Sequence, residues 1–193
     1  VLPNIPVRPN TPANFTLPES PAILFVGLMT YQPNIQAIEG FIDKCWGRIL
    51  AAYPDARLMI AGKSSLPLKE KWAQVKNCIP LGYVENLGDV YRQATFSIAP
   101  IWSGGGSNIK ILEAYMYGKA VVASSHSFDG LKKYIRKNQD ILVANDFDSF
   151  CEQCIGLLAQ PEQALEIAKS GYEQIDQSLS FDQFRNRVIQ GTK

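Results

Sequence analysis

The sequence predicts an α/β protein: a Rossmann-like parallel β-sheet with helices on both faces. Two observations carry this prediction. Short apolar runs end in glycine, as at 22–27 (AILFVG), which is typical of strands buried on both faces. Stretches with apolar residues at three- and four-residue spacing alternate with these runs, as at 35–50, and indicate amphipathic helices. With 193 residues, 46% of them hydrophobic, the chain can form one core without disulfide bonds.

The elements follow one another regularly. The strand at 22–27 leads into a helix that we expect to have Asn34 as its N-cap and to end at Tyr53 and Pro54. The next strand covers 57–61. A later helix, 108–117, is expected to have Gly118 at its C-cap. The remaining strands are predicted at 77–81, 96–100, 120–124 and 141–143, and the remaining helices at 87–93, 147–158, 162–177 and 181–190.

Residues 1–20 differ from the rest of the chain. They hold five of its 12 prolines, separated by polar residues without a clear period. Such a composition is typical of a linker, so we expect a lead-in or hinge at 1–20 and a folded domain at 21–193. Because the first residue is Val1 and no signal peptide follows, we expect a processed form or a piece of a longer protein.

The composition excludes several classes of protein. Lys and Arg number 19 against 18 Asp and Glu, without a basic block, so we expect no nucleic-acid partner. No apolar run approaches the ~18 residues of a transmembrane helix. The cysteines do not form a disulfide pattern, which indicates a reducing, cytoplasmic compartment, and Cys151 and Cys154 are expected to pack within a helix. The four cysteines are Cys45, Cys78, Cys151 and Cys154.

Glycines occur where several predicted strands end. In a parallel sheet ligands bind outside the carboxyl ends of the strands, so these loops are the expected place of a functional site. A glycine at a strand end is also ordinary turn chemistry, but its recurrence favours a ligand site. The glycines concerned are Gly27, Gly62, Gly82, Gly104, Gly105 and Gly106.

The loop after the strand at 96–100 has the features of a phosphate site. Its glycines let the backbone approach a ligand closely, and the helix that follows offers free N–H groups and a partial positive charge. Ser107 and Asn108 add side-chain donors, and Lys110 adds a full charge. The spacing matches neither the dinucleotide fingerprint nor a P-loop, so the sequence predicts only a phosphate-type ligand.

Three nearby residues leave alternatives open. Glu113, three residues after Lys110, is either part of a surface ion pair or a carboxylate that accepts hydrogen bonds from sugar hydroxyls. His126, the only histidine, is either a base near the site or a residue without a chemical role. Trp102 either lines the pocket or packs in the core.

The segment 113–122 (EAYMYGKAVV) and its surroundings resemble the retaining glycosyltransferases of the GT-B fold, family 4 or "group 1". The matching surroundings include 25–27, 33–34, 60–62, 81–84, 87–94 and 99–100, and 2–4 resembles the hinge between two GT-B domains. The resemblance implies that this chain is the C-terminal, donor-binding half of a GT-B fold, which binds a nucleotide diphosphate sugar. It also implies an acceptor, a glycan or a lipid-linked sugar, held by a missing N-terminal domain. The full-length protein would then be cytoplasmic or lie at the cytoplasmic face of a membrane, and this piece alone would be inactive.

The resemblance assigns roles to individual residues. Glu113 is expected to bind the ribose and, with Lys110, to carry catalysis, while 104–108 hold the diphosphate and Tyr83 and Val84 contact the base. Family members need no metal ion or further cofactor, because a helix dipole stabilises the leaving diphosphate. The full set expected to bind the nucleotide sugar is Gly27, Gly62, Lys63, Tyr83, Val84, Gly104, Gly105, Gly106, Ser107, Asn108 and Glu113.

The sequence departs from the family pattern at two places. Gly105 stands where the family has the first glutamate of a spaced pair, and 28–32 (LMTYQ) lacks the Arg and Lys that many members carry after the first strand. We expect Lys110, or else Lys63, to supply that charge. Two alternatives stay open: an epimerase-like enzyme of the GT-B fold, against which the lone His126 argues, and a non-catalytic binding module, which Gly105 favours.

Overall fold

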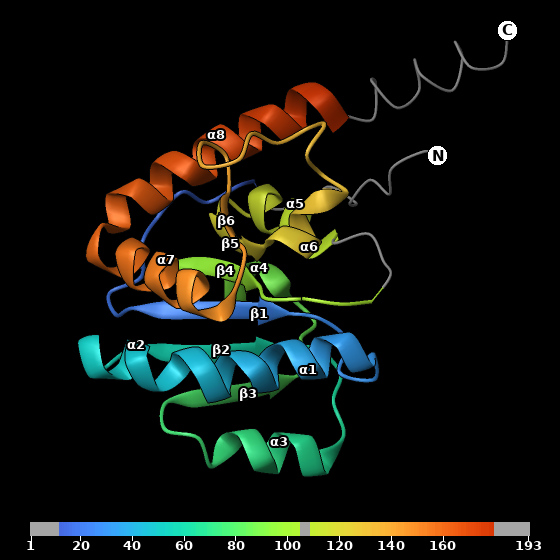
Figure 1. The fold of residues 1–193 in the computed structure, drawn as a ribbon, viewed down its shortest axis with the longest axis vertical. Helices are drawn as coiled ribbons and strands as arrows, with labels where there is room; N and C mark the ends of the chain where they lie inside the picture. The colour runs from blue at the N-terminus through green and yellow to red at the C-terminus, as the bar shows by residue number, and fades with distance from the viewer. Residues whose placement is uncertain (1–11, 105–108, 180–193) are drawn as a thin grey trace, which may run out of the picture.

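The computed structural model describes residues 12–104 and 109–179, and it confirms the predicted α/β class. These residues form a sheet of six parallel strands in the order β3-β2-β1-β4-β5-β6 (Figure 1). Strands β2 and β3 follow on one side of β1, and β4, β5 and β6 follow on the other. The strands are β1 (Ala22–Val26), β2 (Arg57–Ala61), β3 (Cys78–Gly82), β4 (Phe96–Ala99), β5 (Val121–Ser124) and β6 (Leu142–Ala144).

Helices cover both faces of the sheet: α1 (Gln32–Phe41), η1 (Ile42–Trp46), α2 (Gly47–Ala52), α3 (Leu66–Ala73), α4 (Leu87–Arg92), α5 (Ile109–Met116), α6 (Ser125–Asp129), α7 (Phe147–Ala159) and α8 (Pro161–Leu179). Two apolar clusters result, because successive side chains of a strand point to opposite faces. Ile23 and Phe25 of β1 belong to the cluster that includes α1 and α7, whereas Ala22 and Leu24 belong to the cluster with α4 and α5. Helix α8 contributes to both. In Figure 1, α1 and α2 lie in front of β2.

The structure differs from the sequence prediction in the helices. The first helix begins at Gln32, with Tyr31 as N-cap and Pro33 in its first turn, so the prediction of Asn34 as the N-cap is wrong. A five-residue π-helical segment, η1, interrupts this helix. Helices α3 and α6 were not expected from the sequence. The helix predicted at 181–190 lies outside the described residues.

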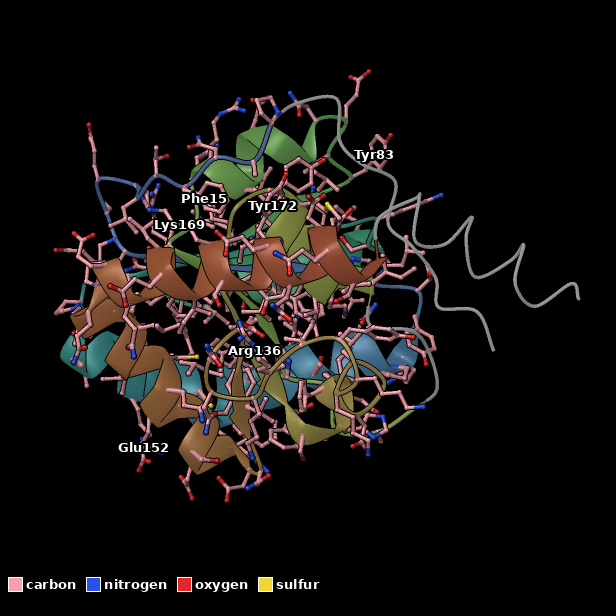
Figure 2. All side chains as sticks on the ribbon, turned by 90° about the horizontal axis from the view of Figure 1, so that it is seen from above. Phe15, Tyr83, Arg136, Glu152, Lys169 and Tyr172 are labelled. Carbon is pink, nitrogen blue, oxygen red and sulfur yellow. The ribbon has the colours of Figure 1, made fainter. Side chains whose placement is uncertain are left out.

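The described part of the lead-in, from Pro12 onward, lies against the domain. The ring of Phe15 meets that of Tyr172 on α8 edge-on, with 5.6 Å between the centroids (Figure 2). Lys119 is only 1% exposed, and its Nζ donates to the backbone oxygen of Thr16 at 2.6 Å. This lysine therefore holds the lead-in against the start of β5.

The cysteines and two tryptophans serve the core, as expected. All four cysteines are free and buried, and Cys151 and Cys154 lie on α7 in the same cluster as Cys45. Burial raises the pKa of Cys45 to about 12. Trp46 and Trp72 are buried. Among the described residues, no helix is both long and apolar enough to cross a lipid bilayer.

Candidate functional site

The site lies where the strand order reverses, at the carboxyl ends of β1 and β4. These strands are neighbours, yet the chain leaves them toward opposite edges of the sheet. Their outgoing loops therefore diverge, and a crevice at this point is the usual ligand site of an open parallel sheet. The loop after β1 leads into α1, and the loop after β4 leads into α5.

Three strand ends come together here through glycine backbone. The N–H of Gly62 donates to the oxygen of Gly82 at 2.7 Å, and the N–H of Gly27 donates to that of Ala61 at 3.0 Å. Gly62 has φ of +140°, and a Cβ on it would lie 1.8 Å from the Gly27 oxygen. The ends of β1, β2 and β3 are thus held at a separation that no side chain at position 62 allows.

Lys110 and Asn34 join the two helices that follow these loops. The Nζ of Lys110, on the first turn of α5, donates to the Oδ1 of Asn34 on α1 at 2.6 Å. The same Nζ lies 4.3 Å from the centroid of the Phe25 ring at the end of β1. Burial lowers the pKa of Lys110 to about 7, although the nearby Glu113 acts in the opposite direction. Near neutral pH this lysine is therefore balanced between its charged and neutral forms.

Glu113 lies one turn further along α5, on the same side as Lys110. The hydroxyl of Tyr91, a buried residue of α4, lies 3.4 Å from its Oε2. Tyr91 in turn stacks on Tyr117, with centroids 4.6 Å apart. Burial raises the pKa of Glu113, while the Tyr91 hydroxyl and Lys110 partly oppose that rise. The carboxyl group of Glu113 is thus held by the hydroxyl of Tyr91, whose ring is fixed by stacking on Tyr117.

Helix α6 holds the loop that follows β4. The Oγ of Ser127 donates to the oxygen of Ala99 at 3.0 Å, and the Oγ of Ser124 donates to that of Ile101. The Nε2 of His126 lies 2.8 Å from the oxygen of Gly104, and since a carbonyl only accepts, Nε2 carries the proton. Helix α6 and its N-cap Ser124 therefore bind three carbonyls between the end of β4 and Gly104.

Gly104 is the point where three strand-end loops meet. Its φ is +100°, and a Cβ there would lie 2.7 Å from Cγ of Pro33 and 3.1 Å from the hydroxyl of Tyr31. Those two residues follow β1, and His126 follows β5. A glycine is required here by both conformation and space.

A family model described as "Glycosyl transferases group 1" matches residues 20–160. This chain belongs to the group 1 glycosyltransferases. An uncharacterized 44.6 kDa protein in the cps region of Klebsiella pneumoniae is 24% identical over 164 residues, which are 81% of this chain and 42% of that protein.

Solved structures share the fold of this chain. A TarM mutant of S. aureus, crystallised with fondaparinux, alpha-GlcNAc-glycerol and UDP, matches with a TM-score of 0.78 at 15% identity, covering 98% of this chain and 38% of that one. The C-terminal domain of a glycosyl transferase group 1 family protein (LpcC) from Francisella tularensis matches with a TM-score of 0.64 at 17% identity, covering 86% of this chain and 89% of that one. The chain thus has the fold of one half of a GT-B protein and spans about two fifths of the Klebsiella and TarM chains.

The group 1 glycosyltransferase fold brings most of the predicted site residues to one edge. Gly27, Gly62 and Lys63 lie at the ends of β1 and β2, and the exposed Lys63 offers its backbone oxygen to the N–H of Met29 at 2.9 Å. Tyr83, 76% exposed and projecting from the molecule (Figure 2), follows β3 with Val84 beside it. Gly105, Gly106, Ser107 and Asn108 lie outside the described residues.

The structure decides between the two alternatives for Trp102. Trp102 packs on the other side of the loop, with its ring 5.0 Å from Phe147 and 6.2 Å from Phe150 of α7. The ring therefore packs against the core, which was the other alternative. Within the described residues no group of three or more His, Cys, Asp or Glu is placed to hold a metal ion.

Sequence reasoning missed two residues of the site. Asn34 was assigned to a helix cap because it follows a proline after the first strand, and its partner Lys110 is 76 residues away. Tyr91 was part of a short predicted helix, and nothing in its neighbourhood indicated that its hydroxyl reaches Glu113. The resemblance includes Asn34 and the segment 87–94 among the parts that match the family, but it gives neither Asn34 nor Tyr91 a role.

Proposed function

We propose that this chain is the donor domain of a sugar transferase, and that the crevice between the ends of β1 and β4 binds a nucleotide diphosphate sugar. The placement of Lys110 carries this proposal. Its ammonium group lies beside a neutral amide and an aromatic ring, and among the described residues no carboxylate lies within ion-pair distance of it. A cation held in this way gains most from an anionic ligand, because its two neighbours are uncharged and Glu113 offsets the cost of its burial only in part.

The diphosphate is the ligand group that we place beside Lys110. The loop 28–32, where many members of the family carry cationic side chains, has none here, and Lys110 reaches across from α5 to the first turn of α1. Lys110 therefore places a positive charge beside the end of β1, although it belongs to α5. We assign Gly104, Gly105, Gly106, Ser107 and Asn108 to the same diphosphate, with the start of α5 adding its partial positive charge.

The nucleoside is assigned to the neighbouring strand ends. Glu113 is placed to accept hydrogen bonds from the ribose hydroxyls, as carboxylates do in related nucleotide folds. The exposed ring of Tyr83 and the adjacent Val84 are assigned to the base, with Gly27, Gly62 and Lys63 between them and the diphosphate. The presence of UDP in the TarM complex supports a nucleotide ligand for the family.

In the sugar transfer that we propose, this domain stabilises the leaving diphosphate by positive charge. As the bond between the anomeric carbon and the diphosphate breaks, negative charge collects on the leaving oxygen, and Lys110 and the start of α5 stabilise it. We therefore propose transfer without a metal ion or further cofactor, with retention at the anomeric carbon. The acceptor, a glycan or a lipid-linked sugar, is assigned to a further domain, so the present chain binds the donor without transferring it.

Calorimetric titration of the chain with UDP, GDP and ADP tests the proposal. We expect one diphosphate to bind preferentially, and both Glu113→Ala and Lys110→Met to weaken it at least about tenfold, the usual effect of losing a charge-assisted hydrogen bond. Glu152→Ala on α7 and Lys169→Met on α8 are matched controls, because both side chains are exposed and lie on helices outside the crevice (Figure 2). Equal affinity in all five proteins, or no binding by folded wild-type chain, would contradict the proposal.

A product analysis separates this function from its chief alternative. An epimerase-like enzyme converts a nucleotide sugar without any acceptor, whereas a transferase requires one. His126, the only histidine, is bonded to the Gly104 backbone, which favours a structural use of the ring over acid–base chemistry. Epimerised nucleotide sugar after incubation without an acceptor would favour the epimerase.

A further inference from the structure

The side chain of Asn34 is a buried link between the loop after β1 and helix α5. It is 6% exposed although it lies in the first turn of α1. Its Nδ2 donates to the backbone oxygen of Leu28 at 2.8 Å, and its Oδ1 accepts from Lys110 at 2.6 Å. A Cβ on Gly27 would lie 2.8 Å from this Nδ2, so the loop after β1 is shaped around the amide.

The chemistry of the two partners fixes which way the amide points. Lys110 can only donate and the Leu28 carbonyl can only accept, so the oxygen of Asn34 must face the lysine and its nitrogen the loop. An aspartate of the same shape would bond the lysine but would turn an oxygen toward the Leu28 carbonyl. A leucine of similar volume would make neither bond. The residue type is therefore matched to this position.

We propose that Asn34 is the positioning residue of the diphosphate site: its neutral amide fixes Lys110 beside the end of β1 without pairing with its charge. This inference rests on the proposed function. A carboxylate at position 34 would hold the lysine equally well, but it would pair with the charge intended for the ligand and repel the phosphates.

The groups around Lys110 support this arrangement. Strand β1 contributes the Phe25 ring, helix α1 the Asn34 amide, and α5 the carboxyl group of Glu113, which the Tyr91 hydroxyl of α4 bonds. Glu113 is the single charged group among them, and its effect does not offset burial, which lowers the pKa of Lys110 to about 7. A doubly charged diphosphate adds opposite charge at close range and therefore raises that pKa, so binding above pH ~7 draws a proton from the buffer.

The first arm of the test needs no ligand. The Cε and Hε signals of Lys110, assigned by their loss in Lys110→Met, are followed by NMR against pH in the free chain. We expect titration near pH 7 in the wild type and a rise of about 1–3 units in Asn34→Asp, because an opposite charge then faces the ammonium. Asn145→Asp adds the same charge at an exposed position after β6 and should leave the titration unchanged.

The second arm measures protons taken up with UDP, by calorimetry at pH ~8 in buffers of different ionisation enthalpy. At this pH the phosphate, whose last pKa is about 6, no longer titrates. We expect the wild type to take up about one proton, Asn34→Leu to bind about tenfold more weakly with uptake retained, and Asn34→Asp to bind weakly and take up at most about half a proton.

Each outcome decides a different claim. An unchanged Lys110 titration in folded Asn34→Asp, or wild-type affinity together with wild-type uptake in both variants, overturns the role of Asn34. If the wild type binds no diphosphate while the titration shifts as expected, the proposed function fails, and the inference reduces to control of the lysine by the amide. Circular dichroism and thermal melting of each variant show whether it is folded.

Discussion

The ring of His126 donates to the backbone oxygen of Gly104 at 2.8 Å, and so joins the first turn of α6 to the loop after β4. Gly104 has a positive φ and lies against Pro33 and Tyr31. The loop that leads to α5 is therefore fixed from the β5 side by a hydrogen bond and from the β1 side by contact. The bond to the Gly104 oxygen thus favours a structural role for His126 over a role in proton transfer.

We expect His126→Ala to weaken UDP binding about threefold to tenfold, the equivalent of one lost hydrogen bond. His126→Gln keeps an N–H donor and should restore part of the affinity. The measurement is calorimetric titration of both variants, with thermal melting to confirm that each is folded. Wild-type affinity in His126→Ala would show that Gly104 is fixed without this bond.

Gly62 is expected to tolerate no side chain. A Cβ there would lie 1.8 Å from the oxygen of Gly27, and φ of +140° is itself unfavourable for any other residue. Gly62→Ala should destabilise the fold by about 3 kcal/mol or more, and lower Tm by ~2–4 °C for each kcal/mol. Gly156→Ala is the matched control, because the space around Gly156 on α7 is open and alanine favours a helix, so Tm should rise slightly.

Tyr91→Phe should alter the pH dependence of binding more than the fold. Burial raises the pKa of Glu113, and the Tyr91 hydroxyl opposes that rise, so its removal raises the pKa further. If Glu113 binds the ribose as proposed, it does so as the ionised carboxylate, so UDP affinity should fall as pH drops through this pKa, and should fall at a higher pH in Tyr91→Phe. Affinities measured from pH ~4 to ~8 test this, and identical acid limbs in the two proteins would separate Tyr91 from Glu113.

The bounds of the strands could be predicted closely from the sequence, because each buried strand is a short apolar run of consecutive residues. Arg57–Ala61 has the predicted bounds, and the other strands begin or end within a residue or two of them. Helix α3 was missed because little of it is buried: Trp72 is its buried residue, so it lacks an apolar stripe. The direction of Trp102 depends on how the chain turns after β4, which composition does not show.

The site was predictable only in part, for a related reason. Lys110, Glu113 and the glycines could be found because they lie near one another in sequence or end predicted strands. The partners that set their properties, Asn34 and Tyr91, come from other elements through the strand order, which the sequence left undetermined. The sequence pattern thus indicated Lys110 and Glu113, whereas their partners Asn34 and Tyr91 can be found only in the folded structure.

We expect Lys110 to lower the free energy of unfolding, by an amount that depends on pH. In the unfolded chain its pKa is close to the ordinary value of 10.5, and in the fold burial lowers it to about 7. Between these values the unfolded chain binds the extra proton, so stability rises with pH, and below pH ~7 the full penalty applies. Lys110→Met should therefore melt higher than the wild type by several degrees at pH ~6, and this advantage should shrink as pH approaches ~10. Lys169→Met, at an exposed position, should show no such trend. A difference in Tm between Lys110→Met and the wild type that stays constant from pH ~6 to ~10 would mean that the ammonium group is not penalised in the fold.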